Sequence, residues 1–247
     1  MGRLYFGDMV KHPRKIVYAA SSAGRLADHP RHKEALSRIA AADFFAISLR
    51  EKANVDFFRA NGFSPALVPD PSLLLSREEW IEIELAPKRS VKNDFVFGYD
   101  LGHKGAVSVR NACDMIAAEW NCSIHIPYPK RFWKDRRVAC APGPAEWLWY
   151  IHHARLVVTN SFHGVMFSLV FNVPFVYLPI IAEDSSLNMR TFDILNYVGL
   201  MNRCLHKTVS LEDEYLRLAN ATIDWGPINE RLSVFRRHGL DYLKGCL

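Results

Sequence analysis

The sequence predicts an α/β protein built from two Rossmann-like units that face each other across a cleft. Short β-branched or aromatic runs alternate with helical patterns along most of the chain, which is typical of parallel sheets made from βαβ units. A charged stretch containing a proline, residues 76–93, interrupts this alternation and is the best candidate for a linker. The sequence shows neither an internal repeat nor a low-complexity tract, so two units account for it best.

The first unit, residues 1–90, is expected to hold three parallel strands. These strands lie near 16–19, 44–48 and 66–68, with helices near 30–40 and 51–61. Polar or turn-forming residues follow each strand, among them Arg50, Glu51 and Asp70. Because the carboxyl ends of parallel strands share one edge, where ligands bind, these side chains are expected at a common edge.

The second unit, residues 91–227, follows the same plan. Its strands are expected near 95–97, 123–126, 156–159 and 175–178, with helices near 105–120, 144–154, 164–171 and 190–199. Pro142-Gly143-Pro144 supplies a breaker and a proline suited to a first helical turn. A last helix, near 228–245, is expected to pack back on the first unit.

Composition and charge narrow the class of protein. Hydrophobic residues make up 49% of the chain and charged residues 23%, the balance of a packed globular protein. The net charge of +5 suits an anionic ligand, a nucleic acid or an acidic membrane face without choosing among them. The densest basic run, residues 130–137, is short and contains Asp135, so a solvated loop or the rim of an acceptor site is favoured over nucleic-acid binding.

The cysteines and the N-terminus predict a cytoplasmic protein. Five scattered cysteines without a Cys-x-x-Cys spacing indicate free thiols in a reducing compartment. No signal peptide or membrane-spanning run is apparent. No metal site is predicted either, since His152 and His153 are adjacent and so are expected to point in different directions on a helix, and no His-Glu-x-x-His is present.

The most informative segment joins a buried strand, residues 156–159, directly to an apolar helix. The backbone N–H groups and the dipole at such a helix start suit a phosphate or a carboxylate. Asn160 and Ser161 are equally well explained as helix caps. His163, among polar neighbours, is a candidate proton donor or acceptor near neutral pH. Arg50 offers a bidentate fork for an anion, or else a salt bridge with Glu51 or a neighbouring helix.

Several of these segments together resemble the polysaccharide pyruvyl transferase family. The resemblance rests on Val158-Thr159-Asn160-Ser161-Phe162-His163-Gly164 and on segments in the same order as in that family, from about Tyr5 to the C-terminus. These segments are Tyr18-Ala19-Ala20-Ser21, Ile47-Ser48-Leu49-Arg50-Glu51, Val68-Pro69-Asp70-Pro71-Ser72-Leu73-Leu74, Asn172-Val173-Pro174-Phe175 and Asn188-Met189-Arg190 ahead of Ile194-Leu195.

The resemblance implies a glycosyltransferase-B-like fold and transfer of a pyruvyl group from phosphoenolpyruvate onto two sugar hydroxyls. The donor is a substrate, and no cofactor is implied. By resemblance, Arg50 and the segment Ser161-Phe162-His163 contact phosphoenolpyruvate, with Arg50 and His163 in catalysis. Asn160, Gly164, Glu51, Asp70, Asn188 and Arg190 are the further candidates for substrate binding, although Asp70 also fits a turn and Asn188 and Arg190 a bracing role.

The resemblance also sets expectations about the N-terminus, the acceptor and the location. Members usually begin with a further α/β segment, so the first unit is expected to be incomplete. The acceptor would be a sugar or a lipid-linked oligosaccharide, and a lipid-linked one would bring the protein to the inner membrane face. The oligomeric state stays open. Two other functions fit the same pattern: a nucleotide-sugar-dependent glycosyltransferase, and a non-catalytic remnant that only binds ligand.

Overall fold

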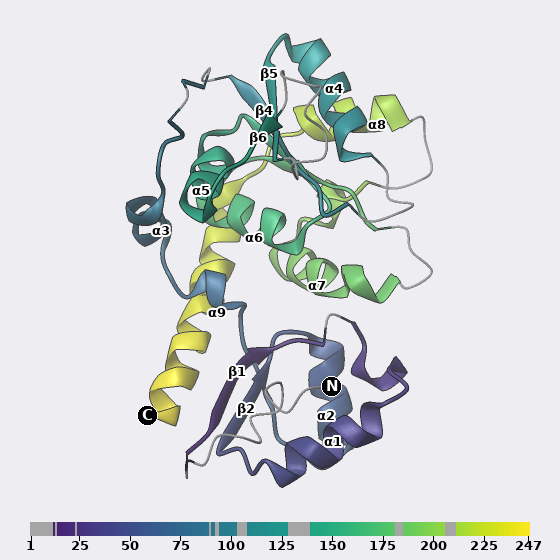
Figure 1. Ribbon diagram of the computed structural model, residues 1–247, viewed down its shortest axis with the longest axis vertical. Coiled ribbons are helices and arrows are strands. Elements are labelled where there is room, and N and C mark those ends of the chain that lie inside the picture. Colours follow the sequence, from purple (N-terminus) through teal and green to yellow (C-terminus); the bar gives the residue numbers. More distant parts are fainter. Residues whose placement is uncertain are drawn as a thin grey trace. The chain divides into compact units, whose positions relative to one another are not determined.

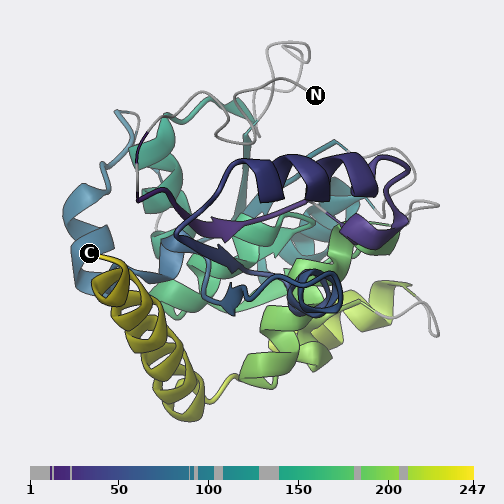
Figure 2. The same ribbon diagram turned by 90° about the horizontal axis from the view of Figure 1, so that it is seen from below.

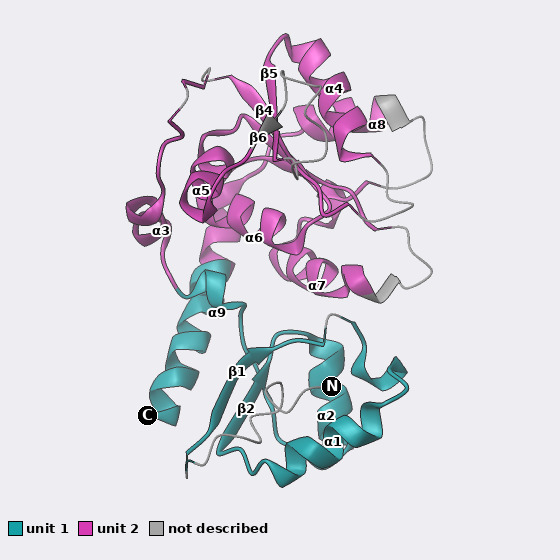
Figure 3. Ribbon diagram, in the orientation of Figure 1, with its two compact units in different colours: residues 1–74, 232–247 teal, residues 75–231 magenta. Residues whose placement is uncertain are grey.

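In the computed structural model the chain forms two compact units, Met1–Leu74 with Leu232–Leu247 and Leu75–Arg231 (Figure 3). The structure describes residues 12, 14–22, 24–88, 90–91, 94–102, 108–127, 139–180, 185–205 and 211–247. The division falls after Leu74, earlier in the chain than the boundary at residue 90 suggested by composition.

Unit 1 contains a three-stranded parallel sheet with the strand order β1-β2-β3 (Figure 1). Its strands are β1 (Ile16–Ala20), β2 (Ala46–Leu49) and β3 (Ala66–Leu67). Its helices are η2 (Leu26–Asp28), α1 (His32–Ala41), α2 (Lys52–Ala60) and η3 (Pro71–Leu73), completed by the C-terminal part of α9 (Trp225–Cys246). Figure 2 shows β1 and β2 side by side from below.

Side chains along β2 point alternately to the two faces of the sheet, and different helices of unit 1 cover these faces. Ile47 and Leu49 pack in an apolar cluster with side chains of α1 and α2. Ser48, between them, points the other way, where its hydroxyl bonds β1 at the Val17 carbonyl, 3.0 Å away. On that side Tyr242 of α9 lies against Tyr18, with ring centroids 6.1 Å apart.

Further contacts hold α9 on unit 1. Arg236 Nε donates to the Leu73 carbonyl at 2.8 Å, and a His238 ring nitrogen lies 2.9 Å from the Leu67 carbonyl. Gly239 makes close approach possible, because an added Cβ would lie 2.6 Å from the Tyr18 hydroxyl. The C-terminal part of the final helix thus packs on unit 1.

Unit 2 contains a five-stranded parallel sheet with the order β6-β5-β4-β7-β8. Its strands are β4 (Phe95–Tyr99), β5 (Ser123–Pro127), β6 (Ala139–Cys140), β7 (Leu156–Thr159) and β8 (Phe175–Tyr177). Its helices are α3 (Arg77–Ile83), α4 (Val109–Trp120), α5 (Pro144–His153), α6 (Phe162–Phe171), η4 (Ser185–Asn188), α7 (Met189–Val198), η5 (Met201–Arg203), α8 (Leu211–Asn220) and the start of α9. From β4 the chain continues to β5 and β6 on one side of the sheet, and from β7 it continues to β8 on the other side. The switch point of the sheet therefore lies between β4 and β7.

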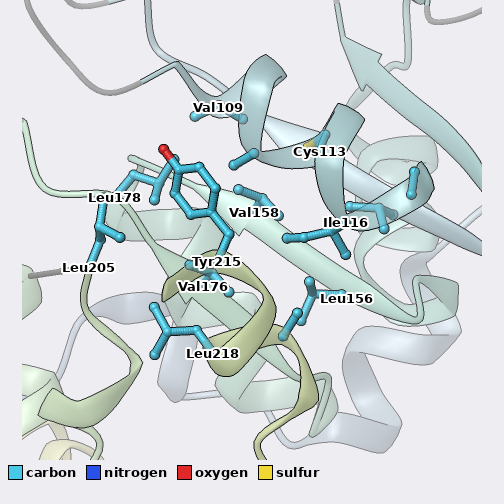
Figure 4. Packing of buried hydrophobic residues seen from close by; sticks show 14 of the residues in the cluster. Val109, Cys113, Ile116, Leu156, Val158, Val176, Leu178, Leu205, Tyr215 and Leu218 are labelled. Atoms are coloured by element: carbon cyan, nitrogen blue, oxygen red, sulfur yellow. The ribbon is translucent and has the colours of Figure 1, made fainter. Parts of the chain in front are cut away.

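Two different cores cover the faces of this sheet. On one face, Tyr215 and Leu218 of α8 and Ile116 of α4 pack on Val158 and neighbouring strand residues (Figure 4). On the other face, Phe97 of β4 stacks on Tyr150 of α5, with centroids 5.5 Å apart. Because one face is aliphatic and the other aromatic, strand residues of β4 alternate between the two types.

The structure also corrects the assignment of residues 76–93 as a linker. Ser76 accepts from the Glu79 N–H and Glu79 accepts from the Ser76 N–H, a capping box that begins α3. The segment therefore belongs to unit 2 and carries a helix. Helix α8 and strand β6 were not expected from the sequence. No helix in the described part of the chain is long and apolar enough to cross a membrane.

Candidate functional site

The segment that joins β7 to α6 is held by side-chain bonds at the switch point. Thr159 donates to the Tyr99 carbonyl of β4 at 2.7 Å and accepts from the Ser161 N–H at 3.0 Å. Ser161 is the N-cap of α6, and its hydroxyl accepts from the Gly164 N–H at 3.4 Å. The capping alternative for Ser161 is therefore realised, and the helix start is fixed against the strand before any ligand arrives.

Gly164 is required by the closeness of this packing. A Cβ at this position would lie 2.5 Å from Thr159 Oγ1, inside any real contact distance. The helix therefore approaches the end of β7 more closely than any residue with a side chain allows.

Asn160 ties the same turn to the loop after β4. Its side chain donates to Asp100 at 2.7 Å and accepts from the Leu101 N–H at 2.9 Å. The residue is 1% exposed, so the buried amide is satisfied by protein groups. Asp100 was not singled out from the sequence, although it directly follows β4, and the strand predicted near 95–97 was a signal that could have pointed to it.

His163 is an exposed side chain on a helix that is otherwise buried. Nine of the ten residues of α6 are buried, and His163, in the first turn, is the exposed one. Its ring lies 5.2 Å from the ring of Phe162, centroid to centroid. A polar side chain thus projects from the positive end of an otherwise buried helix, a position suited to an anion and to proton transfer.

Two further predicted residues, Asn188 and Arg190, lie near this turn in different roles. Asn188 is 3% exposed, and its amide bonds the backbone N–H and carbonyl of Ile180 at 2.9 and 2.8 Å. It also accepts at 2.7 Å from Tyr177, whose pKa burial raises to about 12, so the phenol keeps its proton. Asn188 thus braces the chain after β8.

Arg190 instead contacts the predicted segment. Its guanidinium carbon lies 5.0 Å from the centre of the Phe162 ring, a cation–π arrangement. This contact brings a planar cation beside the first turn of α6. Of the candidates in unit 2, the structure therefore gathers Asn160, Ser161, Phe162, His163, Gly164 and Arg190 at one end of the sheet.

The remaining candidates form a second group, in unit 1. Arg50 Nη1 pairs with Asp70 at 2.7 Å, and Arg50 Nε lies 3.8 Å from Glu51. Asp70 also accepts from the N–H and hydroxyl of Ser72, at 3.0 and 2.7 Å, so the turn-forming role considered for it is present. Glu51 is 1% exposed and accepts from Ser21 and Asn54. Arg50, Glu51 and Asp70 are thus one ionic cluster at the carboxyl edge of the sheet.

A groove of about 550 Å³ opens beside His163 in unit 2. Four aromatic residues, Trp80, Tyr99, Trp147 and Phe167, line it together with His163. We refer to this cavity as the aromatic groove. Its volume is in the range typical of small-molecule sites. No local pattern in the sequence indicates this groove, because its rings come from a strand and three helices that are distant along the chain.

One cluster in unit 2 has the residue types of a metal site. Glu84, His152 and His153 offer ligand atoms within 4.8 Å of one another. The Glu84 carboxylate lies 2.9 Å from His152 Nδ1 and 3.1 Å from His153 Nε2. Adjacent histidines thus reach one carboxylate at the end of α5, contrary to the expectation that they point apart. The basic run at residues 130–137 lies outside the described residues.

A comparison with known protein families shows to which family this chain belongs. A model of the polysaccharide pyruvyl transferases matches residues 2–180. The chain belongs to the polysaccharide pyruvyl transferase family. The match includes the ionic cluster of unit 1 and, in unit 2, the whole turn from Thr159 to Gly164. A search of curated protein sequences gave no match.

Solved structures establish the fold of this family member. The chain is similar to UDP-GlcNAc 2-epimerase of Methanocaldococcus jannaschii, with a TM-score of 0.53 and 11% identity over 91% of this chain and 69% of the epimerase. The corresponding enzyme of Neisseria meningitidis gives a TM-score of 0.52 and 9% identity over 92% and 68%. The expected glycosyltransferase-B-like class, with two Rossmann-like units, is confirmed. Identities this low bear on the fold alone.

Proposed function

We propose that this pyruvyl transferase moves the pyruvyl group of phosphoenolpyruvate onto two hydroxyls of one sugar, giving a cyclic ketal. The observation that supports it most is the exposed His163 at the start of the buried helix α6. Arg190 beside Phe162 adds a cation to this helix start. Phosphoenolpyruvate carries a phosphate and a carboxylate, the two anions that a helix start and a guanidinium bind well.

The reaction follows from the chemistry of an enol phosphate. His163 donates a proton to the methylene carbon, which becomes a methyl group, while a sugar hydroxyl bonds to the central carbon and passes its own proton to the imidazole of His163. The bond from that carbon to the phosphate oxygen then breaks, and phosphate leaves with the electron pair. The second hydroxyl attacks the resulting cation and closes the ring, and its proton ends on phosphate or solvent. His163 serves as acid and then as base.

Other parts of the proposal rest on the family resemblance. By resemblance, Arg50 is assigned to the donor phosphate or carboxylate. Glu51 and Asp70, which contact its guanidinium in the structure, are assigned to holding it. The acceptor is a sugar of a polysaccharide precursor, free or lipid-linked, and the reaction proceeds in the cytoplasm without a metal or a cofactor. A lipid-linked acceptor would place the protein at the inner membrane face.

The decisive experiment compares His163→Ala with the wild type. Ketal formation is followed by NMR, as the new methyl signal, from phosphoenolpyruvate and methyl glycosides of glucose, galactose and mannose, each with a free 4,6-diol. We expect the rate to fall by roughly 10²–10⁴-fold in the variant. Near-wild-type turnover in a folded His163→Ala protein would contradict the role of His163.

Ligand binding separates this function from its rivals. Phosphoenolpyruvate at about a hundred times its Kd should stabilise the wild type by about 2.7 kcal/mol, measured as a rise in the unfolding midpoint. Stabilisation by a nucleotide sugar but not by phosphoenolpyruvate would support a nucleotide-sugar transferase. Stabilisation by phosphoenolpyruvate without turnover would support a non-catalytic binding protein.

A further inference from the structure

We propose that the aromatic groove of unit 2 is the subsite that binds an uncharged pyranose ring of the acceptor. The inference rests on the proposed function, which supplies the reason for a sugar beside His163. It goes further by naming which side chains hold the acceptor and which face of the sugar they touch.

The groove has a floor of mutually fixed rings. Trp80 and Trp147 each form a T-shaped pair with Phe167, with ring centroids 4.9 and 5.4 Å away and interplanar angles of 82° and 89°. Tyr99 lies 5.1 Å from Trp147. Edge-to-face packing of this kind fixes the direction of each ring. The surface is therefore shaped before any ligand binds, which lowers the entropy cost of binding.

Trp80 comes from α3, and a separate set of contacts docks that helix. The Glu84 carboxylate, immediately after α3, contacts both His152 and His153 of α5 at 2.9 and 3.1 Å. The Leu85 N–H donates to the Ala145 carbonyl at 3.1 Å. Glu84, His152 and His153 thus hold α3 against α5. Their role is structural, because this contact positions Trp80.

Charge decides what kind of ligand fits. Among the described residues that line the groove, none is Lys, Arg, Asp or Glu. Phosphoenolpyruvate is multiply anionic, and these lining residues offer it no permanently charged cation in exchange for its hydration, so they suit the donor poorly. A pyranose ring is uncharged, and the C–H bonds on its apolar face carry the partial positive charge that the negative face of an aromatic ring attracts.

The groove also offers polar groups at which sugar hydroxyls could bond. His163 is part of its lining, so a ring stacked on the aromatic residues would lie next to the candidate proton-transfer group. Tyr99, another lining residue, carries a phenolic hydroxyl as a second polar group. A few polar groups in an apolar pocket are what orients a small ligand.

The test measures sugar binding without the donor. Saturation-transfer NMR reports binding of methyl β-D-galactoside, methyl β-D-glucoside and methyl α-D-mannoside to the purified full chain, proton by proton. We expect at least one glycoside to bind through the C–H protons of one ring face. Trp80→Ala should weaken it about tenfold, and Trp80→Phe should restore most of the binding.

A matched control uses another tryptophan of the same unit. Trp120 ends α4, contacts Arg155 and packs against the aliphatic core on the other face of the sheet. Trp120→Ala should leave glycoside binding unchanged, with the unfolding midpoint of each variant recorded to exclude misfolding. Phosphoenolpyruvate stabilisation should be equal in wild type and Trp80→Ala.

The outcomes for the groove and for the proposed function can be told apart. Glycoside binding that Trp80→Ala leaves unchanged, or no binding of any of the three glycosides, would overturn the groove as the acceptor subsite. Trp80-dependent glycoside binding in a protein that neither binds phosphoenolpyruvate nor forms a ketal would support the groove and overturn the pyruvyl transfer proposed above.

Discussion

The two groups of candidate residues, one in each unit, lie at equivalent places in their sheets but are built differently. In unit 1, the residues after β2 and β3 form an ionic cluster, in which the Arg50 guanidinium is held by Asp70 and lies near Glu51. In unit 2, the residues after β4 and β7 join mainly through backbone groups and neutral side chains, and a helix start faces outward.

Because the two groups are built differently, they would bind an anion in different ways. A ligand at Arg50 must share the guanidinium with a carboxylate that is already 2.7 Å away. A ligand at α6 meets a helix start fixed by Thr159 and Ser161, with the Arg190 guanidinium beside the Phe162 ring. Unit 1 therefore orients a charge, whereas unit 2 presents backbone donors at a helix start and the exposed His163.

The largest expected effect comes from breaking the ionic cluster. Arg50→Ala leaves Asp70 and Glu51 buried without their cation, so we expect the free energy of unfolding to fall by about 3–5 kcal/mol. Chemical denaturation, with fluorescence as the readout, measures it. The double variant Arg50→Ala/Asp70→Asn should recover part of the loss, since the asparagine keeps an acceptor for Ser72 and removes one unpaired charge. A single variant as stable as wild type would show that the cluster is not a buried ionic unit.

A second prediction tests the close packing in unit 2. In Gly164→Ala the new Cβ would lie 2.5 Å from Thr159 Oγ1 and push the helix away from β7. Overpacking of this kind costs about 1–3 kcal/mol, more than the helix propensity of alanine, about 1 kcal/mol, returns. Thermal unfolding measures the difference. Gly226→Ala, whose Cβ would meet Asp224 at an ordinary 3.4 Å, is the control and should lose little. Equal midpoints for the two variants would contradict the packing argument.

Local patterns predicted most of the fold and the turn at His163. The run of buried residues in β7, followed by Ser161 and Gly164, marks a strand that enters a helix at once, and the structure has this turn. The order of strands along the chain likewise predicted parallel sheets. These features depend on neighbours in sequence, so periodicity and capping reveal them.

What the sequence did not reveal depends on contacts between distant segments. The pairing of Arg50 with Asp70 joins residues 20 apart, and the bond from Asn160 to Asp100 joins residues 60 apart. The aromatic groove needs Trp80, on a helix within the stretch assigned as a linker. The capping box at Ser76 and Glu79 is a readable signal for that helix, but it lies in a charged stretch with a proline, which is equally typical of a linker.

The smallest expected effect concerns a neutral group in the aromatic face of unit 2. His125 of β5 packs between Phe95 and Tyr150, with centroids 5.0 and 5.4 Å away. Burial lowers the pKa of His125 below its ordinary value of 6.5. The unfolded chain therefore binds a proton at a higher pH than the folded one, and the contribution of this residue to stability is lost as the pH falls below about 6.5.

The comparison with a variant isolates this contribution from that of the carboxylates. His125→Phe keeps an aromatic ring at the same place and removes the titration. We expect wild type to lose more stability than His125→Phe between pH 7 and pH 5, in denaturant unfolding at constant ionic strength. Parallel curves would mean that the imidazole is as free to protonate in the folded protein as in the unfolded chain. Curves that diverge would instead show that the interior of unit 2 keeps His125 uncharged. The two units would then differ in this respect too, since unit 1 holds charged side chains at the edge of its sheet.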